Sequence, residues 1–149
     1  MTRSEKLSPV LKLAVSRKRK AEITAARASH LLREYELKLE ELRQYRAEYS
    51  VVNTSGGQVM NASHLQERQK FIRQLDEGIR ILKNKVKGQQ EITNVDKQAW
   101  LEAHKHNDAI DKLMGKMRKL EWQLRETRED NAMDDRSQHK RNPFQDKTA

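Results

Sequence analysis

The chain has no cysteine among its 149 residues, only two prolines and five glycines, and few aromatic side chains. The missing cysteines exclude a disulfide framework, a thiolate metal site and a cysteine nucleophile. With 36% charged and 5% aromatic residues, the chain cannot fill a thick globular core, but it can fill a thin seam between helices. No apolar run approaches the roughly 20 residues of a membrane span. The first residues lack the apolar core of a secretion signal.

A heptad pattern runs through the first half of the chain. Apolar residues recur with alternating gaps of four and three, which is typical of a coiled-coil seam. A first helix is therefore predicted over residues 5–50, starting near Ser8 and Pro9 because a hydroxyl cap followed by proline suits a first turn. The seam positions are Leu7, Leu11, Ala14, Lys18, Ala21, Ala25, Ala28, Leu32, Tyr35, Leu39, Leu42, Arg46 and Tyr49.

A second seam follows a polar turn predicted over residues 51–62. Ser63 and Gln66 have capping-box spacing, so a second helix is predicted over residues 63–135, with a disordered tail over 136–149 in a single domain, 1–149. The second seam is less apolar between Gln89 and Asp96. The apolar residues Ile92, Val95 and Ala99 lie just beside it there, which suggests a local shift of register. The seam positions are Leu65, Arg68, Ile72, Leu75, Ile79, Leu82, Val86, Gln89, Thr93, Asp96, Trp100, Ala103, Asn107, Ile110, Met114 and Met117.

The two seams can be aligned by folding the chain about Gly57. In this register Leu42 meets Ile72, Ala28 meets Val86, and the odd charges Lys18 and Asp96 pair, although Arg46 also falls opposite Arg68. This agreement predicts an all-α, long two-helix antiparallel coiled-coil hairpin that is a monomer. The second helix would then overhang beyond about residue 107, and the apolar stripe of that overhang points to another protein chain.

Catalytic and ligand-binding chemistry is not expected. His104 and Asp108 are four apart and make at most half of a metal site, since a closed site needs four ligands. A two-helix hairpin has no concave pocket for a reaction, so we expect no enzyme activity, metal or cofactor. The net charge is +9, with one dense cluster at 17–20, but four consecutive helical residues spread around the circumference and lack neighbouring aromatic side chains. We therefore expect protein partners rather than nucleic acid.

Two aromatic side chains near the turn are candidates for a binding surface. Tyr45 and Phe71 lie off the two seams, next to Leu42 and Ile72 and on opposite helices. Large aromatic residues of this kind are common binding hot spots. Gly78 lies inside the second helix, where glycine costs about 1 kcal/mol relative to alanine, and it could thin the surface for a partner.

The segments ELRQYRAEY, residues 41–49, and QERQKFIRQLDEGI, residues 66–79, resemble the FliJ family of flagellar type III export proteins. That family has a Leu-x-x-Tyr-x-x-x-Tyr motif at the end of its first helix and a Gln-x-Phe-Ile-x-x-Leu motif at the start of its second. The matching residues here are Leu42, Tyr45, Tyr49, Gln69, Phe71, Ile72 and Leu75.

The resemblance implies a cytoplasmic export component, peripheral to the inner membrane at the flagellar base, with a hairpin like the central stalk of rotary ATPases. Its implied partners are the export ATPase hexamer, the membrane export gate protein and cargo-specific export chaperones, which it helps to recycle. The family's gate surface maps onto Lys38, Leu42, Tyr45, Tyr49, Phe71, Leu75, Gly78 and Leu82. The implied ATPase-ring surface consists of Arg17, Lys18, Arg19, Lys20, Met114, Met117 and Leu124.

Three other interpretations remain open. The stalk proteins of virulence injectisomes share this architecture, so a role in that secretion system is an alternative. A structural coiled coil could instead self-associate through its overhang. A nucleic-acid-binding hairpin would show a steep dependence of DNA binding on salt.

Overall fold

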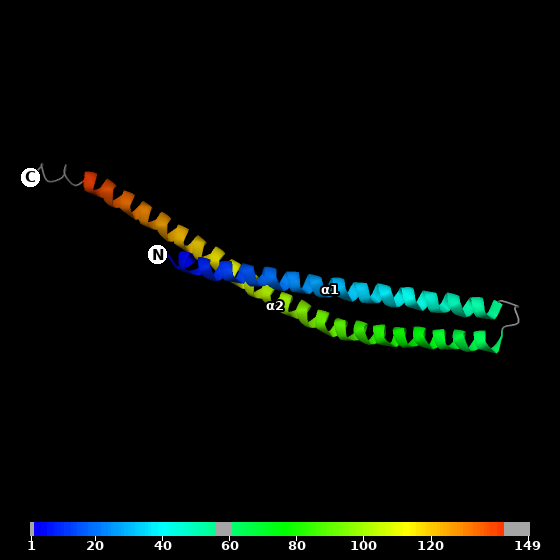
Figure 1. The fold of residues 1–149 in the computed structure, drawn as a ribbon. Helices are drawn as coiled ribbons and strands as arrows, with labels where there is room; N and C mark the ends of the chain where they lie inside the picture. Colours follow the sequence, from blue (N-terminus) through cyan, green and yellow to red (C-terminus); the bar gives the residue numbers. More distant parts are fainter. Residues whose placement is uncertain (1, 56–60, 142–149) are drawn as a thin grey trace, which may run out of the picture. The chain divides into compact units, whose positions relative to one another are not determined.

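The computed structural model describes residues 2–55 and 61–141, and these residues form two long helices, α1 (Arg3–Ser55) and α2 (Ala62–Arg141) (Figure 1). The described residues contain no strand. The predicted all-α fold of two packed helices is thus confirmed. The chain divides into two compact units, which are described separately. Unit 1 comprises residues 1–18 and 103–149, and unit 2 comprises residues 19–102.

The start of α1 differs from the prediction. The Glu5 backbone N–H donates to Thr2 Oγ1 at 3.4 Å, and the Thr2 N–H donates to Glu5 Oε2 at 3.2 Å. This reciprocal arrangement is a capping box, which satisfies backbone donors that lack a partner in the first turn. The predicted start near Ser8 and Pro9 is therefore wrong, because Pro9 lies inside the helix.

The other helix ends also differ from the predicted ranges. The Leu65 backbone N–H donates to the Asn61 carbonyl at 3.1 Å, so Asn61, a favoured N-cap residue, precedes α2. Helix α1 continues through Ser55 into the predicted turn, of which residues 56–60 lie outside the described residues. Helix α2 continues to Arg141, so the start of the predicted disordered tail is helical, and residues 142–149 lie outside the described part.

In unit 2, α1 and α2 lie side by side in opposite directions (Figure 1). Every predicted seam position of α1 in this unit is buried or half-buried, as is every one of α2 except Leu65, which is 51% exposed. Ile92, Val95 and Ala99 are exposed. The suspected shift of register is therefore wrong, and the seam continues through polar residues in the same heptad phase.

Two buried polar side chains show how the helices of unit 2 are aligned. Gln89 Nε2 and Thr93 Oγ1 each donate to the Ala28 carbonyl at 3.2 Å, where Val86 was expected. Thr93 is only 1% exposed. Leu42 likewise lies against Gly78 rather than Ile72, so the predicted register is wrong by about one heptad, or nearly two helical turns. A buried polar pair can specify register in a coiled coil, because only one alignment satisfies its hydrogen bonds.

The correction of register changes the predicted charge pairs. Arg46 Nε donates to Asp76 Oδ1 at 2.9 Å, so Arg46 has an acidic partner across the seam and is not opposed by Arg68. Asp96 lies one seam step beyond Thr93, and its match with Lys18 no longer follows from the register. Lys18 belongs to unit 1 and Asp96 to unit 2, so their pairing stays a prediction.

Unit 1 contains a smaller core between the start of α1 and the middle of α2. Its buried apolar residues are Ala14, Ile110 and Met114. Further along, Ser4 Oγ donates to Glu121 Oε2 at 2.6 Å and the Ser4 N–H donates to Glu121 Oε1 at 3.0 Å. The expected overhang of α2 therefore begins after Glu121 and not at about residue 107, since pairing within unit 1 extends to Glu121. From residue 122 to residue 139 all described side chains of α2 are exposed.

Candidate protein-binding surfaces

Three aromatic rings gather at the end of unit 2 where α1 ends and α2 begins. The Tyr49 and Phe71 ring centroids are 4.9 Å apart with an interplanar angle of 63°. The Tyr45 ring meets Phe71 edge-on, at 6.2 Å and 86°. Such edge-to-face pairs are favourable because the positive edge of one ring meets the negative face of the other. We call Tyr45, Tyr49 and Phe71 the aromatic cluster.

The members of the aromatic cluster differ in their exposure. Tyr45 is 49% exposed, whereas Tyr49 and Phe71 are half-buried. Tyr49 was predicted as a seam residue, and Phe71, predicted to lie off the seam, packs against it. The cluster is thus partly structural, and Tyr45 is the ring most available to a partner.

One cationic side chain contacts the aromatic cluster. The Arg68 guanidinium carbon lies 6.0 Å from the Tyr49 ring centroid, within the range of a cation–π contact. Arg46, four residues after Leu42 on α1, bonds instead to Asp76 and to the Ser50 hydroxyl. Arg68 therefore adds a positive charge to this aromatic surface, whereas the charge of Arg46 is paired.

Gly78 has a structural explanation within the hairpin. A Cβ atom added to it would lie 3.2 Å from Leu42 Cδ2, closer than an ordinary van der Waals contact. Glycine therefore lets Leu42 approach the backbone of α2. Packing against Leu42 is therefore enough to explain the glycine at position 78. That Gly78 thins the surface for a partner stays a prediction.

The other predicted gate residues divide between seam and surface. Leu75 is 8% exposed, Leu42 and Leu82 are half-buried, and Lys38 is exposed. Lys38 and Tyr45 are seven residues apart on α1, and Phe71 and Gly78 are seven apart on α2. Residues one heptad apart share a helix face. The structure thus brings these four to one side of unit 2 and places the leucines inside it.

The predicted ATPase-ring residues differ in their exposure. Of the basic residues, Arg17, Arg19 and Lys20 are exposed and Lys18 is half-buried. Met114 is 2% exposed and fills the core of unit 1, Met117 is half-buried, and only Leu124, 59% exposed, is freely accessible. Leu120 and Trp122 are also 59% exposed. Trp122 was missed, although a large aromatic residue in a charged helix is a signal that sequence analysis can use.

Glu121 is the acidic end of the Ser4 contact in unit 1. Hydrogen bonds from the Ser4 hydroxyl and the Ser4 backbone N–H lower the pKa of the Glu121 carboxyl below 4.5, with help from Arg125 and Arg118. The bond from the backbone also satisfies a donor at the start of α1. Sequence analysis missed this contact because the predicted register ended the pairing earlier.

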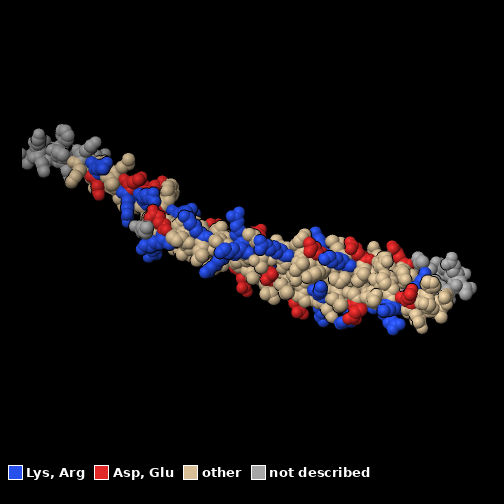
Figure 2. All heavy atoms as spheres, in the orientation of Figure 1, with Lys and Arg blue, Asp and Glu red and all other residues tan. Residues whose placement is uncertain are grey.

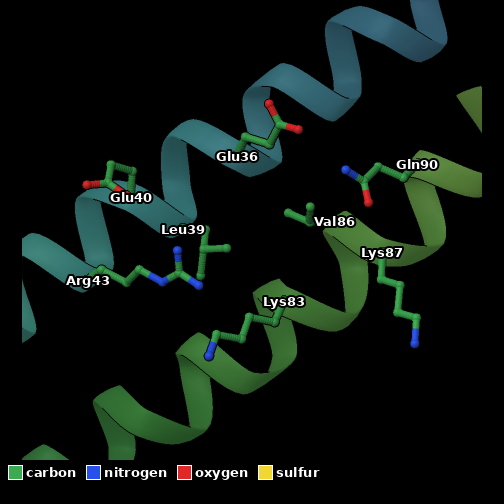
Figure 3. A pocket seen from close by; sticks show the side chains of 8 residues that line it. All are labelled: Glu36, Leu39, Glu40, Arg43, Lys83, Val86, Lys87 and Gln90. Atoms are coloured by element: carbon green, nitrogen blue, oxygen red, sulfur yellow. The ribbon is translucent and has the colours of Figure 1, made fainter.

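A shallow groove of about 420 Å³ lies beside the seam in unit 2 (Figure 3). Leu39 and Val86 point into the space between the helices, while Lys87 extends away from it. Ionic and amide side chains form the rest of the lining. The groove therefore combines apolar contact area with charges of both signs, as protein-binding surfaces do. Its lining residues are Glu36, Leu39, Glu40, Arg43, Lys83, Val86, Lys87 and Gln90.

The remaining charges are distributed over the surface. Figure 2 shows Lys and Arg along the visible face, with Asp and Glu between them. His104 Nε2 lies 3.6 Å from Asp108 Oδ2, and among residues 2–55 and 61–141 no three His, Cys, Asp or Glu side chains come together to hold a metal. Over the same residues, neither helix has a segment long and apolar enough to cross a membrane.

Comparison with known protein families identifies the family of this chain. The family model described as the flagellar FliJ protein matches residues 3–142 of the 149-residue chain. Neither the curated proteins nor the solved structures contain a match to the chain. The matched residues include both helices in full, and therefore the aromatic cluster and the Ser4–Glu121 contact.

Proposed function

Because the chain belongs to the flagellar FliJ protein family, we propose that it connects the flagellar export ATPase to the membrane export gate. Membership of the family gives it a role related to flagellar type III export. In the proposed function it acts as a central stalk at the ATPase ring, is peripheral at the cytoplasmic face of the inner membrane, and helps to recycle cargo chaperones. It binds proteins and catalyses no reaction.

The aromatic cluster is the observation that best supports the gate contact. Tyr45 is half exposed without being needed in the seam, and it lies beside Phe71 and on the same side as Lys38. Truncation of an aromatic anchor of this kind commonly removes about 2 kcal/mol or more of binding energy. The buried members of the predicted set, such as Leu75, would act by supporting this surface.

The ATPase contact is proposed for the exposed surface of α2 on both sides of Glu121, from Arg118 to Arg125. Leu120, Trp122 and Leu124 supply exposed apolar area there, and Arg118 and Arg125 supply positive charge. Met114 is excluded as a direct contact by its burial in unit 1. Replacing Leu124 with glutamate should therefore weaken ATPase binding and leave gate binding unchanged.

The test measures both partners with the same variants. The full chain is mixed with the export ATPase, whose ring assembly and ATP hydrolysis are followed, and separately with the cytoplasmic domain of the gate. Tyr45→Ala should lower only gate binding, and Leu124→Glu only ATPase binding. Loss of both contacts by either variant would contradict two separate surfaces.

The injectisome alternative makes a different prediction in cells. Deleting the gene should abolish swimming if the chain serves the flagellum, whereas it should abolish virulence secretion and spare swimming if the chain serves an injectisome.

A further inference from the structure

A second heptad stripe lies on the outer surface of α2 in unit 2. Its residues directly precede the seam residues, so the stripe faces about 100° away from the seam. Among them Ile81 is 44% exposed, Ile92 53% and Val95 67%. The stripe consists of Gly78, Ile81, Lys85, Gly88, Ile92, Val95 and Ala99. We call these residues the outer stripe.

Two residues of the outer stripe contact α1, Gly78 through Leu42 and Lys85 through the Tyr35 ring, but its three branched side chains take no part in the seam of unit 2. The adjacent seam is filled by other residues, such as Thr93 at 1% exposure, while the three branched side chains of the stripe remain in contact with water. Scattered exposed apolar residues need no explanation, but a row with coiled-coil spacing on a charged helix does. This spacing is what a third helix would need in order to pack against α2.

Gly88 at the centre of the outer stripe gives independent support. Glycine inside a helix costs about 1 kcal/mol relative to alanine, and no described glycine has a positive φ that would require it. Nothing lies within 4 Å of a Cβ added to Gly88, in contrast to Gly78 and its contact with Leu42. The hairpin itself therefore does not explain Gly88, and Gly115 in unit 1 is equally open. Gly88 differs because it lies in a row of exposed apolar side chains, where glycine permits close approach of another backbone.

We propose that the outer stripe joins two copies of this chain in an antiparallel dimer about a two-fold axis near Gly88. The stripe residues before and after Gly88 lie at nearly the same distances from it along the sequence, so two antiparallel copies can be superimposed about this residue. Ile81 of each copy then meets Val95 of the other, and the two Gly88 backbones face each other. The contact is isologous, which is the usual arrangement in a two-fold dimer.

Charge complementarity favours a second copy as the occupant. Lys85 is the only charged residue of the outer stripe, and its ammonium now lies 5.9 Å from the centroid of the Tyr35 ring of α1. In the antiparallel arrangement the Lys85 stem crosses Ile92 of the second copy, next to the exposed Glu91. The symmetry produces this Lys85–Glu91 pair twice.

The dimer should be weak. The outer stripe spans 22 residues, from Gly78 to Ala99, or about 32 Å of helix between the first and last Cα atoms. A single helix-to-helix contact of this length is at the small end of specific interfaces, below about 1,200 Å². At low concentration the chain should therefore be the monomer that the sequence predicts, and the dimer should form only at higher concentration. Each copy keeps its own hairpin, so the dimer does not require the helices to exchange.

Dimerisation would compete with the proposed gate contact. Gly78 belongs both to the outer stripe and to the face that carries the aromatic cluster, so one surface cannot hold both partners. This consequence rests on the proposed function, but the dimer itself does not. Failure of the dimer would leave the gate proposal intact, because the two are measured separately.

The first test is sedimentation of the full chain from low to high micromolar concentration. The wild-type protein should pass from monomer to dimer. Ile92→Glu should weaken association by roughly tenfold or more, since it buries an unpaired charge, and Leu37→Glu, an exposed leucine on another face of α1, should not. A monomer at every concentration, or equal weakening by both variants, would overturn the proposal.

Charge exchange tests the antiparallel alignment. Lys85→Glu and Glu91→Lys should each weaken the dimer, because each places two like charges together. The double variant restores both pairs with their signs reversed, so its association should return toward that of the wild type. A double variant as weak as the single ones would refute this register.

Cysteine cross-linking tests the centre of the dimer in a chain that has no cysteine of its own. Gly88→Cys should form a disulfide between copies under mild oxidation, because the two positions face each other within the roughly 7 Å that a disulfide needs between Cα atoms. Asn84→Cys, exposed one turn away, should not, since the copies of that position are about 12 Å apart along the axis. Equal cross-linking of both, or of neither, would contradict the two-fold axis at Gly88.

Discussion

Replacing Tyr45 and Phe71 separately should distinguish the binding and the structural parts of the aromatic cluster. Tyr45 is 49% exposed and meets only the edge of Phe71. An edge-to-face pair contributes about 0.5–1.5 kcal/mol, and alanine regains a few tenths through its helix propensity. Tyr45→Ala should therefore lower the free energy of unfolding by about 1 kcal/mol, or about 3 °C in Tm.

Phe71→Ala should cost more stability, about 2 kcal/mol, because Phe71 is half-buried and contacts two rings. For gate binding Tyr45→Ala is the more informative of the two variants, because it removes the exposed ring with the smaller loss of stability. Tyr45→Ala should raise the Kd for the gate by roughly thirtyfold, the equivalent of 2 kcal/mol, while the hairpin stays folded. Circular dichroism, urea unfolding and calorimetric titration measure these quantities.

The matched control is Leu37→Ala, which removes a 58% exposed apolar side chain from a different face of α1. It should change neither stability nor gate binding appreciably. If Tyr45→Ala unfolds the protein, the ring belongs to the core. If it folds and binds the gate like the wild type, the assignment of the gate to the aromatic cluster is wrong.

Three further predictions concern packing and pH, and urea unfolding measures each of them. Gly115→Ala should stabilise the protein by about 1 kcal/mol through helix propensity, because nothing lies within 4 Å of its added methyl, whereas Gly78→Ala should gain less since its methyl meets a leucine at 3.2 Å. Thr93→Ala should cost about 2 kcal/mol by removing a buried methyl group and a hydrogen bond, and the same change at the exposed Thr127 should cost little. Glu121→Gln should lower stability at pH 7, and the difference from wild type should disappear as the pH falls through the lowered folded-state pKa of Glu121, because the stabilising bonds from Ser4 favour the ionised carboxylate. A difference that persists unchanged in acid would show that the charge of Glu121 is not involved.

The fold could be predicted because one physical rule repeats along the chain. Apolar residues every 3.5 positions define a seam without any knowledge of the partner, and the predicted positions from Leu7 to Tyr49 are all buried or half-buried. Polar seam residues are harder to interpret. Gln89 and Thr93 resembled a break in the pattern, but they are among the most deeply buried side chains, since both find an acceptor on the facing helix.

The alignment of the two helices could not be obtained from the same rule. A heptad pattern tolerates a slip of one heptad, because the apolar positions coincide again after seven residues. The hydrogen bonds to Ala28 and the close contact between Gly78 and Leu42 select one alignment, and neither can be recognised from the hydrophobic pattern. The error of about one heptad then affected the candidate sites, where it opposed Arg46 to Arg68 and left Met114 without a partner.

Gly78 and Gly88 show why the remaining site residues need a structure. Both occupy the same kind of position in α2, ten residues apart on the outer stripe, and a sequence gives no reason to separate them. In the folded hairpin Gly78 accommodates Leu42, while Gly88 has open space around it. A glycine that the chain's own packing explains says nothing about partners, and one that it does not explain is a place to look for them. Gly88, rather than Gly78, is therefore the better guide to an intermolecular contact.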